Sequence, residues 1–531
     1  MRLKYIFCGL GLMALGCNKG FLNVNNNPNA PSSGAPSLIF TNALTFTATI
    51  INGYGGSGNG DFFNLNYPMS YEALSSNYQV AYNITRNNYT STDFAGVWTD
   101  IYHNLNDYLQ VEEGAEAGSE PFLEAGSKVM EALDYQMLVD AYNDVPYSQA
   151  LQLPGGVTNP AYDQAQSVYN ACLGKLDTAI GIFESDSVNG NGAYNPGSAD
   201  VLFGGTATSW IQLANTLKLR IILHEINVSS QASTIQAEAA KIAADPNGCL
   251  GAGQTAFVNP GYATDAAAHL NPLWATMGYS ITGALANADQ SANSYFIAKL
   301  GGYNDPRVGF FYLCALSTGL PSGNPFGIPT NASSTYVGSG LQVDANSGNT
   351  IYPYNVPTTQ TLWGILQSPT QKAILVSSWE SLFLQAEAIE RGLLPGGDAA
   401  AETAYESAIA ENFAYLNVYT DGTTTGAPAN FASTYYGQSM VNVGWAASTD
   451  KIQAIITQKY ISLCFTNVEE AWTDYRRTGF PVDLPLSTDP AALYPRVLRF
   501  IYPQSEYDSN TDNVDKEGDV SPVTPKIFWM P

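Results

Sequence analysis

Residues 370–416 read TQKAILVSSWESLFLQAEAIERGLLPGGDAAAETAYESAIAENFAYL and predict two helices joined by a tight turn. Apolar residues recur at spacings of three and four on each side of a Gly- and Pro-containing centre, which is the period of a half-buried helix. We therefore expect helices over 370–391 and 398–416, with one apolar stripe made by Leu375, Trp379, Leu382, Phe383, Ala386 and Ile389, and the other by Ala401, Ala404, Tyr405, Ala408, Ile409, Phe413 and Leu416.

The centre of this stretch contains the residues that end one helix and begin another. Glu387 precedes Arg391 by four residues, a spacing that favours a supporting ion pair on a helix. Gly392 can end the first helix, Pro395 prevents its continuation, and Asp398 can cap the second. The pattern is typical of a helical hairpin.

The same period recurs along much of the chain, so we expect a mainly α fold built of tetratricopeptide-like helical-hairpin repeats packed against a loop-rich ligand-binding face. The repeats are expected over about 92–228 and 370–480, in a single domain spanning 37–531. Trp98, Trp210, Trp379 and Trp472 fall on apolar stripes and should be buried. The Gly-, Pro- and Asn-rich insertion at about 230–370, with the stretch 50–90, is the expected ligand-facing side. Further helices are predicted over 94–109, 121–137, 163–185, 208–227 and 450–472.

The first 17 residues resemble a lipoprotein signal peptide. A short positive region precedes an eleven-residue apolar run, which is too short to span a bilayer. Gly16 then stands directly before Cys17, which we expect to be acylated and to anchor the protein, with 18–36 as a polar tether. The alternative is an ordinary cleaved signal peptide in which Cys17 is incidental.

Charge and cysteine content exclude several classes of protein. There are 21 Lys plus Arg against 46 Asp plus Glu, a net charge of -25, so we expect no nucleic-acid binding. Only 13% of residues are charged and 33 are Tyr, which suits neutral ligands rich in hydroxyls or amides. Cys172, Cys249, Cys314 and Cys464 show no metal-binding spacing and are expected to be buried thiols, although a disulfide among them stays open.

No enzymatic motif stands out, and we expect neither catalysis nor a cofactor. His103, His224 and His269 are each isolated among apolar or small residues, which is not the arrangement of a zinc site or a histidine base. Gly53, Gly55 and Gly58 match a dinucleotide fingerprint, but no helix is expected after them, so the match is attributed to chance. Paired carboxylates for glycoside hydrolysis are not marked by the sequence.

A weak calcium pattern lies near the C-terminus. Asp508, Asn510, Asp512 and Asp519 occupy positions one, three, five and twelve of a calcium-binding loop, but Asn513 stands where the sharp turn needs glycine. We favour a solvated acidic loop, with a calcium site of another type as the alternative.

Several landmarks, in a shared order over nearly the whole chain, resemble the SusD/RagB family. The segment 139–150, VDAYNDVPYSQA, is similar to a family turn in which glycine is common at the place of Asn143. ANTLKLR at 214–220 and NDPR at 304–307 follow. The strongest match is NVEEAWTDYRRTGFP at 467–481.

This resemblance implies the fold, location and partner of such proteins. It implies an outer-membrane lipoprotein, facing the exterior, that binds glycan and delivers it to a SusC-like TonB-dependent transporter. Peptide in place of glycan is the alternative ligand. A helical-repeat scaffold and a surface hydrolase are alternatives of other classes.

Two groups of residues are given different roles. Arginine beside aromatic rings commonly serves packing, so Trp472, Tyr475, Arg476 and Arg477 are expected to be structural, as are Lys218 and Arg220. Ligand contacts are predicted instead on aromatic residues that no helical stripe explains, since such rings can stack on sugars. These are Tyr71, Tyr78, Tyr82, Trp274, Tyr279 and Tyr336.

Overall fold

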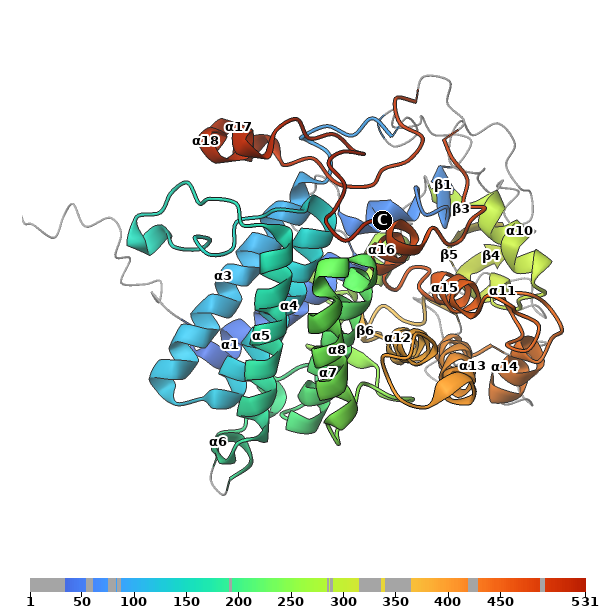
Figure 1. Ribbon diagram of the computed structural model, residues 1–531, viewed down its shortest axis with the longest axis horizontal. Coiled ribbons are helices and arrows are strands. Elements are labelled where there is room, and N and C mark those ends of the chain that lie inside the picture. Colours follow the sequence, from blue (N-terminus) through green and yellow to red (C-terminus); the bar gives the residue numbers. More distant parts are fainter. Residues whose placement is uncertain are drawn as a thin grey trace, which may run out of the picture.

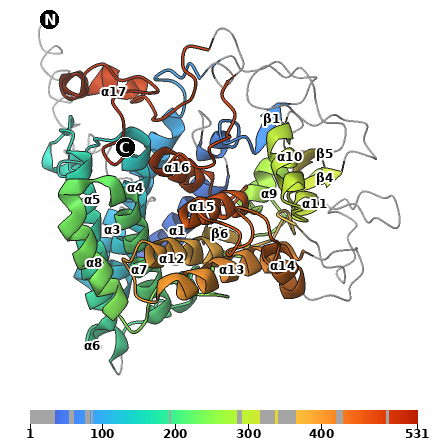
Figure 2. The same cartoon turned by 45° about the vertical axis from the view of Figure 1, so that its right-hand side comes forward.

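A computed structural model describes residues 34–53, 61–74, 83, 87–190, 193–283, 286, 290–314, 336–339, 364–418, 428–487 and 492–531. This part of the chain is mainly helical, with three two-stranded antiparallel sheets. Two groups of helices lie side by side, and short strands and helices gather at one edge (Figures 1 and 2). The predicted mainly α fold is confirmed.

The first helical block is built around α4, which is buried along nearly its whole length between α3 and α5. Pro121 opens α4 at a position where its missing N–H has no helical partner. Helix α1, which was not predicted, packs on α4 through Phe40, and a Cβ at Gly126 would lie 2.6 Å from the ring of Phe40. The block consists of α1 (Pro36–Asn52), α3 (Ala95–Gly118), α4 (Pro121–Tyr142), α5 (Ala165–Glu184), α6 (Asp186–Asn189), α7 (Ala207–His224) and α8 (Ala232–Ala244).

The second helical block contains the predicted hairpin as α12 and α13. Gly392 has a positive φ of 71°, and the next residue, Leu393, donates its N–H to the carbonyl of Ala388, which closes the end of α12. Asp398 lies inside the first turn of α13 and accepts the indole N–H of Trp445, so it is not the cap. The block consists of α12 (Ser378–Glu390), α13 (Gly397–Leu416), α14 (Pro428–Tyr436), α15 (Lys451–Ser462) and α16 (Val468–Thr478).

Three predicted elements differ in the structure. Residues 373–376 form strand β6 and not the start of a helix, because the four-residue apolar run AILV is buried and pairs with β2 (Ala256–Val258). The block predicted over 450–472 is two helices, with Asn467 capping α16 by accepting the N–H of Glu470. Helix α8 lies within the insertion that was predicted to be loop-rich.

The remaining described elements form the loop-rich edge and a C-terminal excursion. Arg307, from the NDPR segment, joins this edge to the second block by donating to Asp305, Asn412, Gln458 and Ser462. No helix in the described part of the chain is both long and apolar enough to span a bilayer. The elements are β1 (Glu72–Leu74), α9 (Pro272–Met277), β3 (Gln290–Ala292), α10 (Ser294–Gly302), α11 (Val308–Phe311), β4 (Tyr312–Cys314), β5 (Tyr336–Ser339), α17 (Gln504–Ser509) and α18 (Thr511–Val514).

The described cysteine thiols are free. Cys172 and Cys464 are buried and Cys249 is partly buried, and none of the three forms a disulfide. Burial raises the pKa of Cys172 to about 12, so this thiol stays protonated and unreactive at neutral pH.

Candidate functional site

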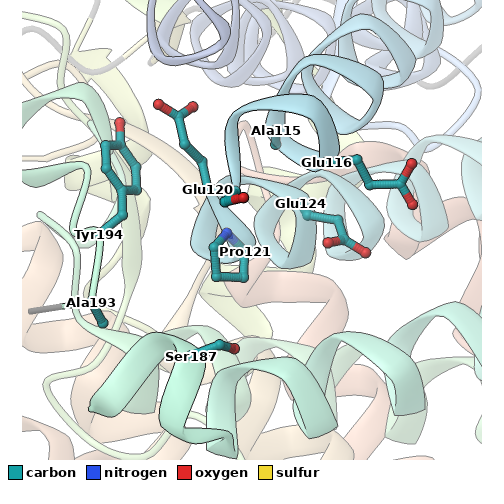
Figure 3. Close-up of a pocket in the computed structure, with 9 residues that line it drawn as sticks. Ala115, Glu116, Glu120, Pro121, Glu124, Ser187, Ala193 and Tyr194 are labelled. Atoms are coloured by element: carbon teal, nitrogen blue, oxygen red, sulfur yellow. The ribbon is translucent and has the colours of Figure 1, made fainter. Parts of the chain in front are cut away.

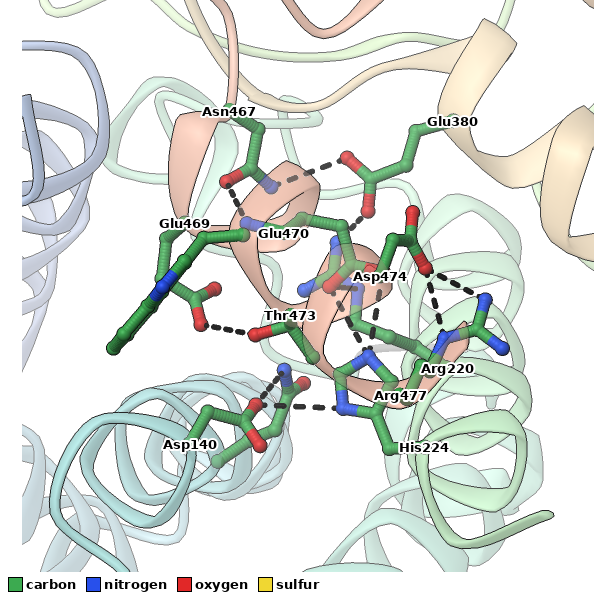
Figure 4. Close-up of polar contacts among 12 residues, drawn as sticks. Asp140, Arg220, His224, Glu380, Asn467, Glu469, Glu470, Thr473, Asp474 and Arg477 are labelled. Carbon is green, nitrogen blue, oxygen red and sulfur yellow. Dashed lines mark hydrogen bonds and ion pairs between the residues drawn. The ribbon is translucent and has the colours of Figure 1, made fainter. Parts of the chain in front are cut away.

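The two helical blocks meet at a buried cluster of charged side chains (Figure 4). Arg220 of α7 pairs with Glu380 of α12, and its Nε lies 3.6 Å from Glu470 of α16. Lys459 of α15 lies 2.7 Å from Glu470 and 2.9 Å from Asp474. Each charge thus has an opposite partner, which a buried ion requires. We call this set the junction cluster: Asp140, Arg220, His224, Glu380, Lys459, Glu470, Asp474 and Arg477.

A bidentate ion pair extends the junction cluster toward α12. Arg477 donates to the two carboxylate oxygens of Glu387 at 2.6 and 2.5 Å and to Asp474 at 2.6 Å. Burial tends to raise the pKa of Glu387, but the charge of Arg477 outweighs it and holds that pKa at about 2. Arg391, four residues after Glu387, adds a bond of 2.8 Å, as the sequence spacing predicted.

Arg476 is held between aromatic rings. Its guanidinium carbon lies 3.4 Å from the ring centroid of Trp472 and 4.9 Å from that of Trp529. It also donates to the carbonyl of Leu498 at 3.2 Å. The predicted structural role of Trp472, Arg476 and Arg477 is confirmed, because all three are buried and fully engaged in packing and hydrogen bonds.

The partners of His224 could not be predicted from the sequence. Its Nδ1 lies 3.4 Å from Asp140, and its Nε2 lies 3.2 Å from Glu470, a residue 246 positions away in the chain. These contacts are non-local, so no spacing in the sequence marks them. Since the junction cluster is buried, we assign it to joining the blocks and not to contact with a substrate.

Three of the predicted ligand contacts are accounted for by packing. Tyr71 is buried, stacks on Tyr460 at 4.7 Å between centroids, and donates its hydroxyl to the Tyr460 carbonyl at 2.5 Å. Trp274 is buried and donates its indole N–H to the carbonyl of Tyr279 at 3.0 Å, and Tyr279 is itself buried. In this conformation these rings expose no face to a ligand, because the core covers them.

The other three predicted contacts are not located by the structure. Tyr78 and Tyr82 lie outside the described residues. Tyr336 begins β5, of which only the backbone is described.

The calcium pattern falls on helical structure. Asp508 lies in α17 and Asp512 lies in α18, with Asn510 between the two helices. The amide of Asn510 donates to the carbonyl of Pro160 at 2.9 Å and accepts from Asn513 at 2.8 Å, so it ties two loops together. Among the residues that the structure describes, no group of three or more His, Cys, Asp or Glu is placed to hold a metal ion.

One side of α10 carries a row of aromatic and charged residues at the loop-rich edge. Tyr295 and Lys299 lie four residues apart on α10, and Tyr303 follows after four more residues, directly at the end of the helix. This spacing places the three side chains on one face. The hydroxyl of Tyr295 donates to Asp483 at 2.9 Å, and Lys299 donates to both oxygens of Asp483 at 2.9 and 3.1 Å. We call Tyr295, Lys299, Tyr303 and Asp483 the α10 surface.

The α10 surface is partly accessible and mixed in character, since its two tyrosines are half-buried and only 6% of the Lys299 side chain is exposed. The side chain of Asp483 is 58% exposed, and the loop that carries it also exposes Val482 and Leu486. Lys299 lies 5.2 and 5.5 Å from the centroids of Tyr295 and Tyr303, so it is held between the two rings. Rings beside a carboxylate offer stacking and hydrogen bonding together. Sequence reasoning missed this row, although its spacing of four was visible.

A hollow of about 400 Å³ lies at the other end of the first block, between the α3–α4 turn and α6 (Figure 3). Glu116, Glu120 and Glu124 line it together with Tyr194. Its three carboxylates make it acidic, and no basic residue is among the described residues that line it.

The fold is shared with solved structures of one class of protein. A SusD/RagB family protein from Bacteroides thetaiotaomicron is 20% identical, with a TM-score of 0.70, covering 94% of this chain and 99% of that chain. A SusD homologue from Bacteroides uniformis is 21% identical, with a TM-score of 0.67, covering 93% of this chain and 99% of that chain. A chitin-binding SusD homologue from Flavobacterium johnsoniae is 21% identical, with a TM-score of 0.68, covering 93% of this chain and 98% of that chain.

The sequence itself identifies the family. Residues 28–503 match the SusD-like family described as "Starch-binding associating with outer membrane". The chain therefore belongs to the SusD-like family. A comparison with curated proteins finds no match.

Proposed function

We propose that this chain is an outer-membrane lipoprotein that binds glycan at the α10 surface and delivers it to a SusC-like TonB-dependent transporter. The observation that carries the proposal is the pairing of a partly exposed tyrosine on α10 with the exposed carboxylate of Asp483, which lies in the loop after α16. Rings stack on the apolar faces of sugars while carboxylates accept hydrogen bonds from hydroxyls. The family description as starch-binding and the chitin-binding homologue support glycan as the ligand.

A glycan array with the purified chain, followed by titration calorimetry with each hit, tests the proposal. We expect Tyr303→Ala and Asp483→Asn each to weaken binding by about 1 to 3 kcal/mol, as truncation of an interfacial anchor does. Tyr194→Ala, in the glutamate-lined hollow, is the matched control and should leave affinity unchanged. Loss of binding in the Tyr194 variant alone would move the site to that hollow.

Tyr78, Tyr82 and Tyr336 remain predicted ligand contacts. Alanine substitution of each residue, followed by the same calorimetric titration, tests these predictions. A peptide library screened beside the glycan array separates glycan from peptide, because only the ligand class that binds can respond to the α10 variants. Release of shortened products from a bound ligand would favour a surface hydrolase instead.

The anchor and the partner need separate tests. We expect Cys17→Ala to yield a folded, unacylated chain that leaves the membrane fraction, because acyl chains provide the proposed attachment. Affinity purification of the wild-type chain from solubilised outer membranes should co-purify a TonB-dependent transporter. Recovery of the chain without a transporter, under conditions that keep other outer-membrane complexes together, would favour a scaffold or a free binding protein.

A further inference from the structure

His224 lies between two carboxylates from different helical blocks. Its Nδ1 is 3.4 Å from Asp140 on α4, and its Nε2 is 3.2 Å from Glu470 on α16. A neutral imidazole has one N–H and one lone pair, so one nitrogen of a neutral His224 would present a lone pair to a carboxylate. An imidazolium donates at both nitrogens. The positions of the two carboxylates therefore select the charged ring.

Figure 4 shows His224 between Asp140 and the helix that carries Glu470. Tyr169 of α5 lies 3.1 Å from Nδ1 but donates its hydroxyl to Asp140, so its oxygen is left to accept an N–H from Nδ1. The same Asp140 accepts the indole N–H of Trp529 near the C-terminus at 2.8 Å. The titratable groups that act on the ring directly are Asp140 on α4, Tyr169 on α5, Glu225 in the turn after α7, and Glu469 and Glu470 on α16. The cations act through these carboxylates: Arg220 on α7 and Lys459 on α15 lie beside Glu470, and Arg476 on α16 acts on Asp140.

We propose that His224 is a buried imidazolium that joins the two helical blocks, and that its deprotonation in mildly alkaline solution loosens their junction. We call this proton-dependent contact the clamp. The clamp is independent of the α10 surface. It is therefore a property of the fold that holds whether or not the proposed ligand is right.

Electrostatics around the ring agree with this geometry. Burial lowers the pKa of His224, but the charges of Glu470 and Asp140 outweigh burial and raise that pKa to about 9. Glu225 is buried with both oxygens lacking a hydrogen-bond partner in the structure, and burial raises its pKa to about 8. Burial and the charge of Asp140 also raise the pKa of Glu469.

The signs of these shifts act in the same direction. The pKa of His224 is above its ordinary value, so its contribution to stability is complete below about pH 6.5 and is lost as the pH rises through about 9. The pKa of Glu225 is also above its ordinary value, so its contribution to stability is complete below about pH 4.5 and is lost as the pH rises toward about 8. Both contributions to the junction are therefore lost by mild alkali.

The small number of histidines makes a direct test practical. The chain has three, so ¹⁵N-histidine labelling gives three sets of side-chain signals in an NMR spectrum. We expect both nitrogens of His224 to be protonated at about pH 7.5, a pH at which an ordinary histidine is mostly neutral. His269, which is exposed, is the internal reference. A His224 ring with one protonated nitrogen at that pH would overturn the proposal.

Hydrogen exchange tests the loosening of the junction. After correction for the intrinsic pH dependence of exchange, protection of amides in α7 and α16 should fall between about pH 7 and 9.5 by on the order of tenfold per unit of pKa difference. His224→Gln should abolish most of this fall, and His269→Gln should not change it. If His224→Gln does not fold, Glu225→Gln replaces it as the test variant. It removes one of the two ionisations and should reduce the fall in amide protection. An identical fall in wild type and in these junction variants would contradict the clamp.

Discussion

Asn143, at the turn after α4, has a backbone conformation that favours glycine. Its φ is 72° and its ψ is -110°, and its side chain accepts the N–H of Phe528 at 2.7 Å. We expect Asn143→Ala to cost about 1 to 3 kcal/mol more than Asn143→Gly, because both variants lose the side-chain hydrogen bonds and only glycine adopts this backbone conformation without strain. Urea denaturation measures both. Equal costs would mean that the backbone conformation is not limiting.

Arg477 and Arg391 contact the same carboxylate from environments that differ in burial. Arg477 is buried, and its removal leaves Glu387 and Asp474 without their main cation. We expect Arg477→Met to lower the free energy of unfolding by about 3 to 5 kcal/mol, because an uncompensated charge is then buried. Arg391→Met is the matched control and should cost at most about 1 kcal/mol, since Arg391 is partly exposed. Similar losses in both variants would contradict a special role of burial.

At the scale of the elements, substitution of two helical glycines by alanine distinguishes the effect of packing on stability from the effect of helix propensity. Gly126 on α4 faces Phe40 of α1, whereas Gly174 on α5 is exposed and a Cβ there would meet nothing within 4 Å. Alanine in an exposed helix is favoured over glycine by about 1 kcal/mol, so Gly174→Ala should stabilise. Gly126→Ala should destabilise by about 1 to 2 kcal/mol net, because overpacking outweighs propensity. Stabilisation by both substitutions would show that α1 adjusts freely.

The long helices could be predicted because their evidence is local. A stripe of apolar residues predicted α3, α4, α5, α7 and α13, and cap residues such as Gly392 and Asp450 lie where helices end or begin. Residues 373–376 were assigned to a helix because their pairing with 256–258 is distant in sequence, and a short apolar run is ambiguous. Helix α8 was missed because its surroundings are rich in Gly, Pro and Asn.

The candidate sites were less predictable than the helices because their contacts join residues that are distant in the sequence. Tyr71 and Trp274 lie on no long apolar stripe in the sequence, but both are buried after folding, where Tyr71 stacks on Tyr460 and Trp274 donates to the carbonyl of Tyr279. His224 acquires its carboxylates from α4 and α16, which no local pattern encodes. The structural role of Arg476 and Arg477 was predictable, since it followed from aromatic residues beside them in the chain.

At the scale of the whole molecule, the chain places many of its few cations in its interior. At least eight of the 21 Lys and Arg side chains are buried, and at least fifteen of the 46 Asp and Glu side chains are buried with them, so burial removes more negative than positive charge from the surface. With a net charge of -25 the chain stays acidic, which agrees with the exclusion of nucleic acid. The buried cations are Lys218, Arg220, Arg307, Lys459, Arg476, Arg477, Arg496 and Arg499.

The buried charges also predict how stability depends on pH. The pKa of Glu387, lowered to about 2, gives stability that is present above about pH 4.5 and is lost as the pH falls through about 2. The raised pKa values of Glu225 and His224 give stability that is lost as the pH rises toward 8 and 9. We therefore expect the free energy of unfolding to be greatest near pH 4.5 to 5, about 3 kcal/mol or more above its value at about pH 9.

Urea denaturation at a series of pH values, in low and in high salt, separates buried charges from surface repulsion. A surface with a net charge of -25 also repels itself more as the pH rises, but salt at about 1 M shortens the Debye length to roughly 3 Å and screens that repulsion. Charges in the junction cluster are away from solvent and are screened much less. The alkaline loss should therefore persist in high salt, and its disappearance there would assign it to the surface and not to His224 and Glu225.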